Sequence, residues 1–142
     1  MKNNAFTLLE MLLVLSISLT MITLTIYPIS TTLSSLTEKQ LLEEVEAAIY
    51  FAQLNAITTS NDTVISFQPE INQFSSSTAT SALTNIQFDN SLKINHIKPE
   101  KFRFSGLDGS INRFATVHFS GKKQTYKLIF QIGKGRFRIE AN

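Results

Sequence analysis

The sequence contains no cysteine and no tryptophan, and only five glycines and three prolines among its 142 residues. Without cysteine the chain has no disulfide scaffold, no Cys-ligated metal site and no thiol nucleophile. Its two histidines, His96 and His118, do not have the spacing of metal ligands, and no Gly-x-Ser-x-Gly motif supplies a nucleophile for either of them. We therefore expect no catalytic residues, no metal site and no cofactor.

Charge is missing from one long stretch near the start of the chain. None of the 27 residues from Met11 to Thr37 is charged. As a helix this stretch would extend about 40 Å, whereas the hydrocarbon core of a bilayer is about 30 Å thick. Its serine and threonine hydroxyls can bond to the carbonyl one turn earlier, so they do not prevent a helix in lipid. We expect residues 6–33 to form the transmembrane half of an N-terminal helix.

A cleaved secretory signal and an uncleaved membrane anchor are the ordinary interpretations of such a segment. No alanine or glycine occurs from Phe6 to Glu46, so the usual small-x-small cleavage site is missing unless serine or threonine serves in it. The acidic Glu10 lies inside the start of the apolar run, where a charge is costly. A cleaved signal is therefore disfavoured, and an uncleaved anchor stays open.

The stretch Ala5–Leu15, AFTLLEMLLVL, resembles the class III signal of type IV pilins and pseudopilins. The resemblance implies that prepilin peptidase cuts between Ala5 and Phe6, which releases a 1–5 leader, and that Phe6 is N-methylated. Family leaders most often end in glycine, so Ala5 is a departure that still supplies a small side chain. In the family the glutamate at the position of Glu10 pairs with the terminal amine of a neighbouring subunit, which compensates a carboxylate in lipid. The resemblance therefore assigns Glu10 to assembly.

Residues 34–62 are expected to form the amphipathic, soluble half of the same helix. From Glu38 to Asp62 there are five acids and one base, a net charge of −4. At 100° per residue, one stripe about 120° wide holds the main apolar residues. These are Leu41, Leu42, Val45, Ala48, Ile49, Ala52 and Ala56. With no glycine from Phe6 to Ser105, we expect one helix that ends near Thr58.

Three larger apolar residues, Tyr50, Phe51 and Leu54, lie off the stripe. They are either scattered apolar surface or contacts with neighbouring subunits in a filament. Composition does not decide between the two.

Residues 63–142 are expected to form an antiparallel β domain, because the apolar period changes to two. The predicted strands are Thr63–Gln68, Asn85–Asp89, Lys93–Ile97, Phe102–Ser105, Phe114–Ser120, Tyr126–Ile132 and Arg136–Glu140. The uncharged Ser/Thr-rich run over 73–85 is interpreted as a loop. The fold class is therefore α+β: a long N-terminal helix packed on a C-terminal antiparallel β-sheet, as in pilins.

The β domain is basic. From Lys93 to Asn142 there are 11 lysines or arginines against 3 acids, a net charge of +8. Strand alternation places Tyr126, Leu128, Phe130 and Ile132 on the helix side of the sheet. The opposite side is expected to hold Lys127, Arg136 and Arg138, with Arg103 and His118 from earlier strands. This face either contacts DNA phosphates, docks on the acidic helix of the next subunit, or faces solvent.

Motifs near the C-terminus are similar to those of the competence minor pilins of low-GC Gram-positive bacteria. They are FRFS at 102–105, TVHF at 116–119, YKLIF at 126–130 and GKGRFRI at 133–139. The resemblance implies a minor subunit of a DNA-uptake pilus in natural transformation, a single-pass membrane protein that reaches the cell surface on assembly. The implied partners are other pilins of the filament, prepilin peptidase, a membrane platform protein, the lipid bilayer and DNA. A pseudopilin of a type II secretion-like system, a motility pilus subunit and a direct DNA receptor stay open.

Overall fold

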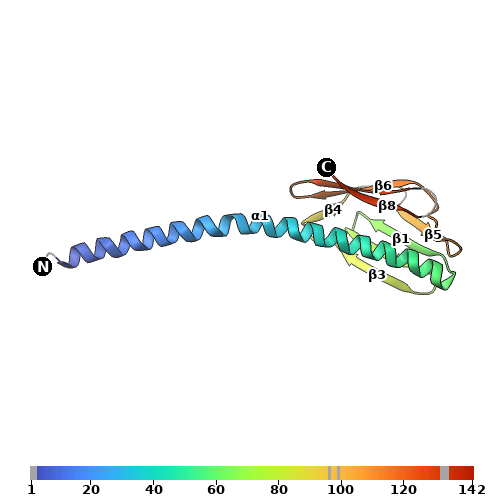
Figure 1. The fold of residues 1–142 in the computed structure, drawn as a ribbon, viewed down its shortest axis with the longest axis horizontal. Helices are drawn as coiled ribbons and strands as arrows, with labels where there is room; N and C mark the ends of the chain where they lie inside the picture. The colour runs from blue at the N-terminus through green and yellow to red at the C-terminus, as the bar shows by residue number, and fades with distance from the viewer. Residues whose placement is uncertain (1–2, 96, 99, 132–134) are drawn as a thin grey trace. The chain divides into compact units, whose positions relative to one another are not determined.

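The computed structural model describes residues 3–95, 97–98, 100–131 and 135–142 (Figure 1). Within these residues one helix, α1 (Asn3–Thr59), is followed by eight strands. The strands are β1 (Thr63–Gln68), β2 (Gln73–Ser77), β3 (Ala82–Gln87), β4 (Leu92–Ile94), β5 (Lys101–Phe104), β6 (Ala115–Gly121), β7 (Thr125–Phe130) and β8 (Phe137–Ala141). The chain divides into two compact units, Met1–Leu36 and Thr37–Asn142, which we call the N-terminal unit and the C-terminal unit.

The N-terminal unit is helical in all its described residues, and helix α1 is unbroken through Pro28. One stretch of it, the 19 residues Thr7–Thr25, is long and apolar enough to cross a bilayer, and its side chains are exposed. Its hydroxyls bond to carbonyls three or four residues earlier, as predicted; Ser18 Oγ, for example, donates to the Val14 carbonyl over 2.8 Å. The same pattern holds for Ser16, Thr20, Thr23 and Thr25. No hydroxyl of this group needs water, so the stretch suits lipid.

In the C-terminal unit the predicted apolar stripe of α1 is confirmed. Val45, Ile49, Ala52 and Ala56 are fully buried, and Leu42 and Ala48 are nearly so. The alanines carry only a methyl group, so the sheets can approach the helix backbone closely. The stripe joins one hydrophobic core with the inner faces of the strands.

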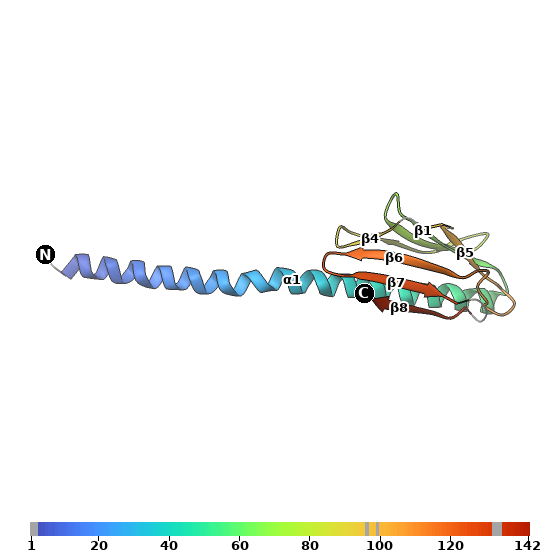
Figure 2. The same ribbon diagram turned by 90° about the horizontal axis from the view of Figure 1, so that it is seen from above.

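The strands of the C-terminal unit form two antiparallel sheets where the sequence predicted one (Figure 2). One sheet has the order β3-β2-β1-β5 and the other β4-β6-β7-β8. Phenylalanine rings connect the two: Phe67 of β1 lies 6.2 Å from Phe119 of β6 and 6.4 Å from Phe130 of β7, measured between ring centroids. Period-two alternation shows which side chains face inward but not which strands pair, so it could not separate two sheets from one.

The prediction of a loop over 73–85 was wrong. Strands β2 and β3 pair antiparallel through this segment, with Phe74 opposite Ile86, and both of these side chains are buried. Ser77 pairs with Ala82 after a register shift, and Thr78 N donates to the Ser81 carbonyl in the turn. Threonine is a good strand former, and the two apolar anchors bury the hairpin on the core. The Ser/Thr-rich composition was taken for a loop although it fits a solvated strand face.

The other predicted strands are present with shifted ends, and β1 has the predicted bounds Thr63–Gln68. Tyr126, Leu128 and Phe130 of β7 are buried, as expected for the helix side. Some predictions concern residues outside the described part of the chain: Ile132 as the end of a strand, Gly133 and Lys134 as part of a turn, and His96.

Candidate functional site

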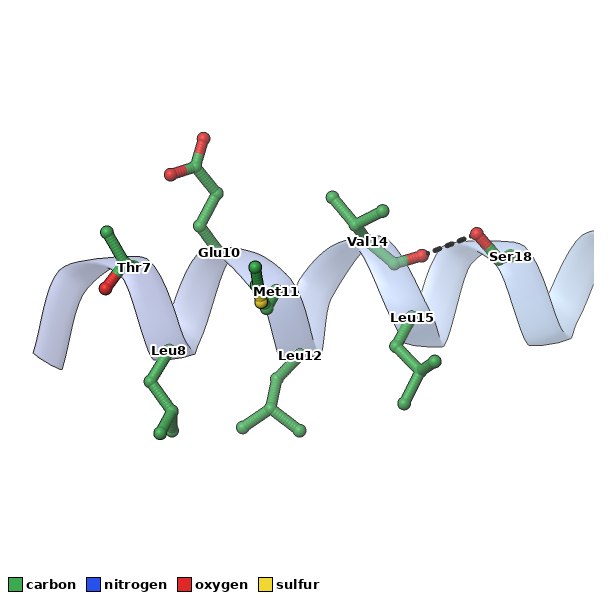
Figure 3. A pocket seen from close by; sticks show the side chains of 8 residues that line it. All are labelled: Thr7, Leu8, Glu10, Met11, Leu12, Val14, Leu15 and Ser18. Atoms are coloured by element: carbon green, nitrogen blue, oxygen red, sulfur yellow. Dashed lines mark hydrogen bonds between the residues drawn. The ribbon is translucent and has the colours of Figure 1, made fainter. Parts of the chain in front are cut away.

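Glu10 lies on the exposed surface of α1 inside the apolar stretch Thr7–Thr25. Its carboxylate projects from the side of the helix opposite Leu8 and Leu12, whose side chains are 64% and 58% exposed (Figure 3). Together with their neighbours these residues line an open apolar surface. Among the described residues no ion pair of Glu10 is present. In lipid this carboxylate therefore needs a cationic partner that the described part of the chain does not supply.

The predicted basic face is built by the register of β6, β7 and β8. His118 of β6 lies opposite Lys127 of β7, and Lys127 lies opposite Glu140 of β8. Arg138 lies opposite Ile129, and its Nε atom is 2.8 Å from the Glu140 carboxylate. Glu140 thus places a negative charge beside both Lys127 and Arg138. The face is less basic than the composition of the segment indicated.

Arg103 does not belong to the same face, which corrects the grouping expected from the sequence. It lies on β5, in the sheet that does not contain β7 and β8. Its guanidinium is 3.2 Å from the Asp62 carboxylate, just beyond the end of α1. Asp62 also accepts a hydrogen bond from the backbone N–H of Gly106. Arg103 therefore takes part in fixing the loop after β5. Arg136 is exposed and directly precedes β8.

Glu38 is the polar residue that the sequence pattern did not single out. The sequence pattern counted it only as one of the five acids between Glu38 and Asp62, yet just 1% of its surface is exposed. One carboxylate oxygen accepts a hydrogen bond from the backbone N–H of Lys122 at 2.9 Å, and the other accepts one from the Tyr126 hydroxyl at 3.2 Å. Glu38 thus joins the first turn of the helix in the C-terminal unit to the turn between β6 and β7.

Gly121 and Tyr126 both pack closely against the Glu38 carboxylate. A Cβ atom on Gly121 would collide with the Glu38 carboxylate, so the approach requires glycine. Burial, together with the negative charge of Glu38, raises the pKa of the Tyr126 hydroxyl, although a hydrogen bond from Gln124 opposes the shift. The tyrosine therefore stays protonated and donates to the carboxylate. We refer to Glu38, Gly121, Lys122 and Tyr126 as the Glu38 contact.

The helix residues predicted off the stripe are half-exposed. Tyr50, Phe51 and Leu54 have exposed fractions of 53%, 49% and 59%. The Tyr50 ring lies 4.7 Å from the Phe137 ring of β8, between centroids, so one of the three also packs within the unit. The other two leave an apolar strip on the outer side of α1.

A long helix that begins with an exposed apolar stretch and later buries a small-residue stripe against antiparallel sheets is the pilin fold. The minor pilin FimU of the type IV pilus of Pseudomonas aeruginosa matches this chain in two crystal forms. The first gives a TM-score of 0.57 at 16% identity, with 72% of this chain and 91% of FimU covered. The second gives a TM-score of 0.58 at 16% identity over 72% of this chain and 87% of FimU.

The minor pseudopilin EpsH of the type II secretion system of Vibrio cholerae matches with a TM-score of 0.56 at 11% identity, over 70% of this chain and 92% of EpsH. No protein-family model matches the sequence, and comparison with curated proteins gives no match. At these identities the likeness establishes the fold. It extends to proteins of two kinds of machinery, a pilus and a secretion system.

Proposed function

We propose that this chain is a membrane-anchored minor pilin, a structural subunit that assembles with other pilin-like subunits into a filament. The observation that carries the proposal is the sequence AFTLLE placed at the start of the exposed apolar stretch of α1, in a chain with the pilin fold. Prepilin peptidase would cut between Ala5 and Phe6, and Phe6 would then carry the free, methylated amine. A platform protein in the membrane would drive assembly.

Mass spectrometry of the mature N-terminus tests this proposal. When the chain is produced together with a prepilin peptidase, we expect a first residue of N-methylated Phe6. Ala5→Leu should block the cut because the peptidase requires a small residue there, whereas Ala5→Gly should preserve it. An intact Met1, or a cut beyond the apolar stretch, would contradict the pilin assignment and restore the plain anchor or the secretory signal.

Within this class we propose a role in DNA uptake during natural transformation. The support is the resemblance of the C-terminal motifs to the competence minor pilin ComGD. A pseudopilin of a type II secretion-like system and a motility pilus subunit share the same stalk chemistry, so they are the alternatives. Deleting the gene separates the three, because we expect loss of transformation with secretion and twitching motility intact.

A direct DNA receptor is the second candidate function. It is favoured by the half-buried Lys127 of β7, the exposed Arg138 of β8 and the exposed Arg136 directly before β8. If Lys127, Arg136 and Arg138 neutralise phosphates, reversing their charges should lower the slope of log affinity against log salt by roughly one for each phosphate no longer neutralised. Glu140→Gln should strengthen binding, since it removes the acid that pairs with Arg138.

The matched control reverses Lys98, Lys101 and Arg113, which are exposed but lie outside β7 and β8. Binding can be measured on the C-terminal unit, because its buried core lies wholly between Leu42 and Phe130. If both triple reversals lower the slope equally, only the net charge matters and the receptor role of these three residues is wrong.

A further inference from the structure

We propose that the turn between β6 and β7 docks on anionic lipid headgroups while the subunit is anchored in the membrane, before it enters a filament. Three exposed lysines form the docking surface, and we call Lys39, Lys122 and Lys123 the turn lysines. The inference rests on the proposed membrane anchoring of α1. It adds a lipid-facing surface on the folded C-terminal unit, which anchoring by itself does not require.

The Glu38 contact gathers these lysines. Lys122 donates its backbone N–H to Glu38, and Lys39 is the next residue of the helix. Because both carboxylate oxygens of Glu38 are bonded to the β6–β7 hairpin, the turn is held at this point of α1. The three ammonium groups therefore stem from one end of the C-terminal unit.

The order of the chain favours a position of this end near the bilayer surface, because the charge-free run ends directly before the Glu38 contact. The charge-free run Met11–Thr37 has 27 residues, which as a helix extend about 40 Å, and Glu38 and Lys39 follow it directly in the sequence. A bilayer with its headgroups is about 40–45 Å thick. Leu33 and Leu36, 62% and 51% exposed, keep the last turns before this end apolar. Lys39 is thus the first cation of the chain after a run long enough to span a bilayer.

The local charge balance favours an anionic surface. Two acids lie near these lysines: Asp89, whose pKa is lowered mainly by hydrogen bonds from Ser91 with a smaller effect of Lys122, and Glu43, one turn after Lys39 on α1. Lys93 of β4 adds a fourth cation. It is exposed and directly follows Leu92, which pairs with Gly121 at the end of β6. Glu38 itself is buried and hydrogen-bonded. Salt screens electrostatic attraction beyond a Debye length of about 8 Å. The lysines closest to the membrane therefore contribute most of the attraction to anionic lipid.

The experiment uses the full chain in vesicles and a fluorophore on a single introduced cysteine, which the cysteine-free sequence allows. Thr125→Cys reports on the turn, and Leu107→Cys, at a side chain that is 94% exposed in the loop after β5, is the control position. The quencher is a nitroxide attached to lipid headgroups. Adding phosphatidylglycerol to phosphatidylcholine vesicles should raise quenching at Thr125→Cys and leave Leu107→Cys unchanged.

Replacing all three turn lysines by glutamine should abolish the effect of phosphatidylglycerol, since each lysine near an anionic surface changes the bound population roughly five-fold. The matched variant Lys98→Gln, Lys101→Gln, Arg113→Gln has the same change in net charge and should keep the effect. The proposal is wrong if phosphatidylglycerol has no effect, or if both triple variants lose it equally. It is also wrong if the turn variant loses affinity for DNA but keeps the lipid effect.

Alkaline extraction of the same vesicles separates failure of this inference from failure of the anchor. A chain that resists extraction yet shows no lipid-dependent quenching is anchored without docking. Extraction of the chain at alkaline pH would contradict the membrane anchor, and the docking proposal, which rests on the anchor, would then also be wrong.

Discussion

Glu38→Ala is expected to lower the free energy of unfolding of the C-terminal unit by about 2–4 kcal/mol. The substitution leaves the part-buried Lys122 N–H and the buried Tyr126 hydroxyl without their acceptor, and an unsatisfied buried group costs about 1–3 kcal/mol. Relief from burying a charge offsets part of the loss, which keeps the total below the sum of the parts. Urea unfolding of the unit Thr37–Asn142 measures the effect.

Two further variants distinguish the Glu38 contact from a general effect of losing a helix acid. Glu43→Ala removes an exposed glutamate one turn away and should change stability by no more than about 0.5 kcal/mol. Glu38→Gln keeps an acceptor for Lys122 and should cost less than Glu38→Ala. If the alanine variants of Glu38 and Glu43 are equally stable, the contact does not stabilise the unit.

A double-mutant cycle with Tyr126→Phe isolates the hydroxyl–carboxylate interaction. In the Glu38→Ala background the loss of the hydroxyl should cost less than it does in the native chain, because its acceptor is already missing. Additive effects would mean that Tyr126 and Glu38 contribute independently to the free energy of unfolding. The hydrogen bond between them would then add nothing to stability.

The burial of Glu38 could have been predicted from the sequence, and the reason it was not is specific. Glu38 precedes Ala56 by 18 residues, which is five full turns of a helix, so it lies at the centre of the buried stripe. The stripe was defined from apolar residues alone, so Glu38 was counted only toward the net charge of the helix. A charged residue in register with a buried stripe is a signal for a buried polar contact. Its partners, however, come from the β6–β7 hairpin, 84 and 88 residues later in the chain.

Local patterns predicted local structure well in this chain. The long apolar run and the helical spacing of the apolar residues after it predicted α1. The alternation in TVISFQ predicted β1 with its bounds. Which strands pair with each other cannot be predicted from the sequence of one segment alone. The position of Arg103 in the other sheet and the acid Glu140 opposite Lys127 both follow from registers that no single segment encodes. The basic face was for that reason predicted as larger and more positive than it is.

The second large effect concerns assembly. Glu10→Ala is expected to leave cleavage at Ala5–Phe6 intact and to reduce incorporation of the subunit into sheared filaments by roughly ten-fold or more, because removing one partner of a buried ion pair costs several kcal/mol. On the proposed function, the partner is the amine of Phe6 on a neighbouring subunit. The ratio of mutant to native subunit in purified filaments, with equal amounts in the membrane, measures the effect.

Companion substitutions separate charge from shape at this position. Glu10→Gln keeps the size of the side chain but not the charge, so it should fail nearly as badly as alanine if an ion pair docks the subunit. Ser18→Ala, two turns along the same helix, removes only a hydroxyl that bonds to the Val14 carbonyl within α1, and should assemble normally (Figure 3). Normal incorporation of Glu10→Gln would show that hydrogen bonding suffices, and normal incorporation of Glu10→Ala would remove Glu10 from assembly altogether. Because cleavage is read separately by mass spectrometry, either result would leave the assignment of the leader untouched.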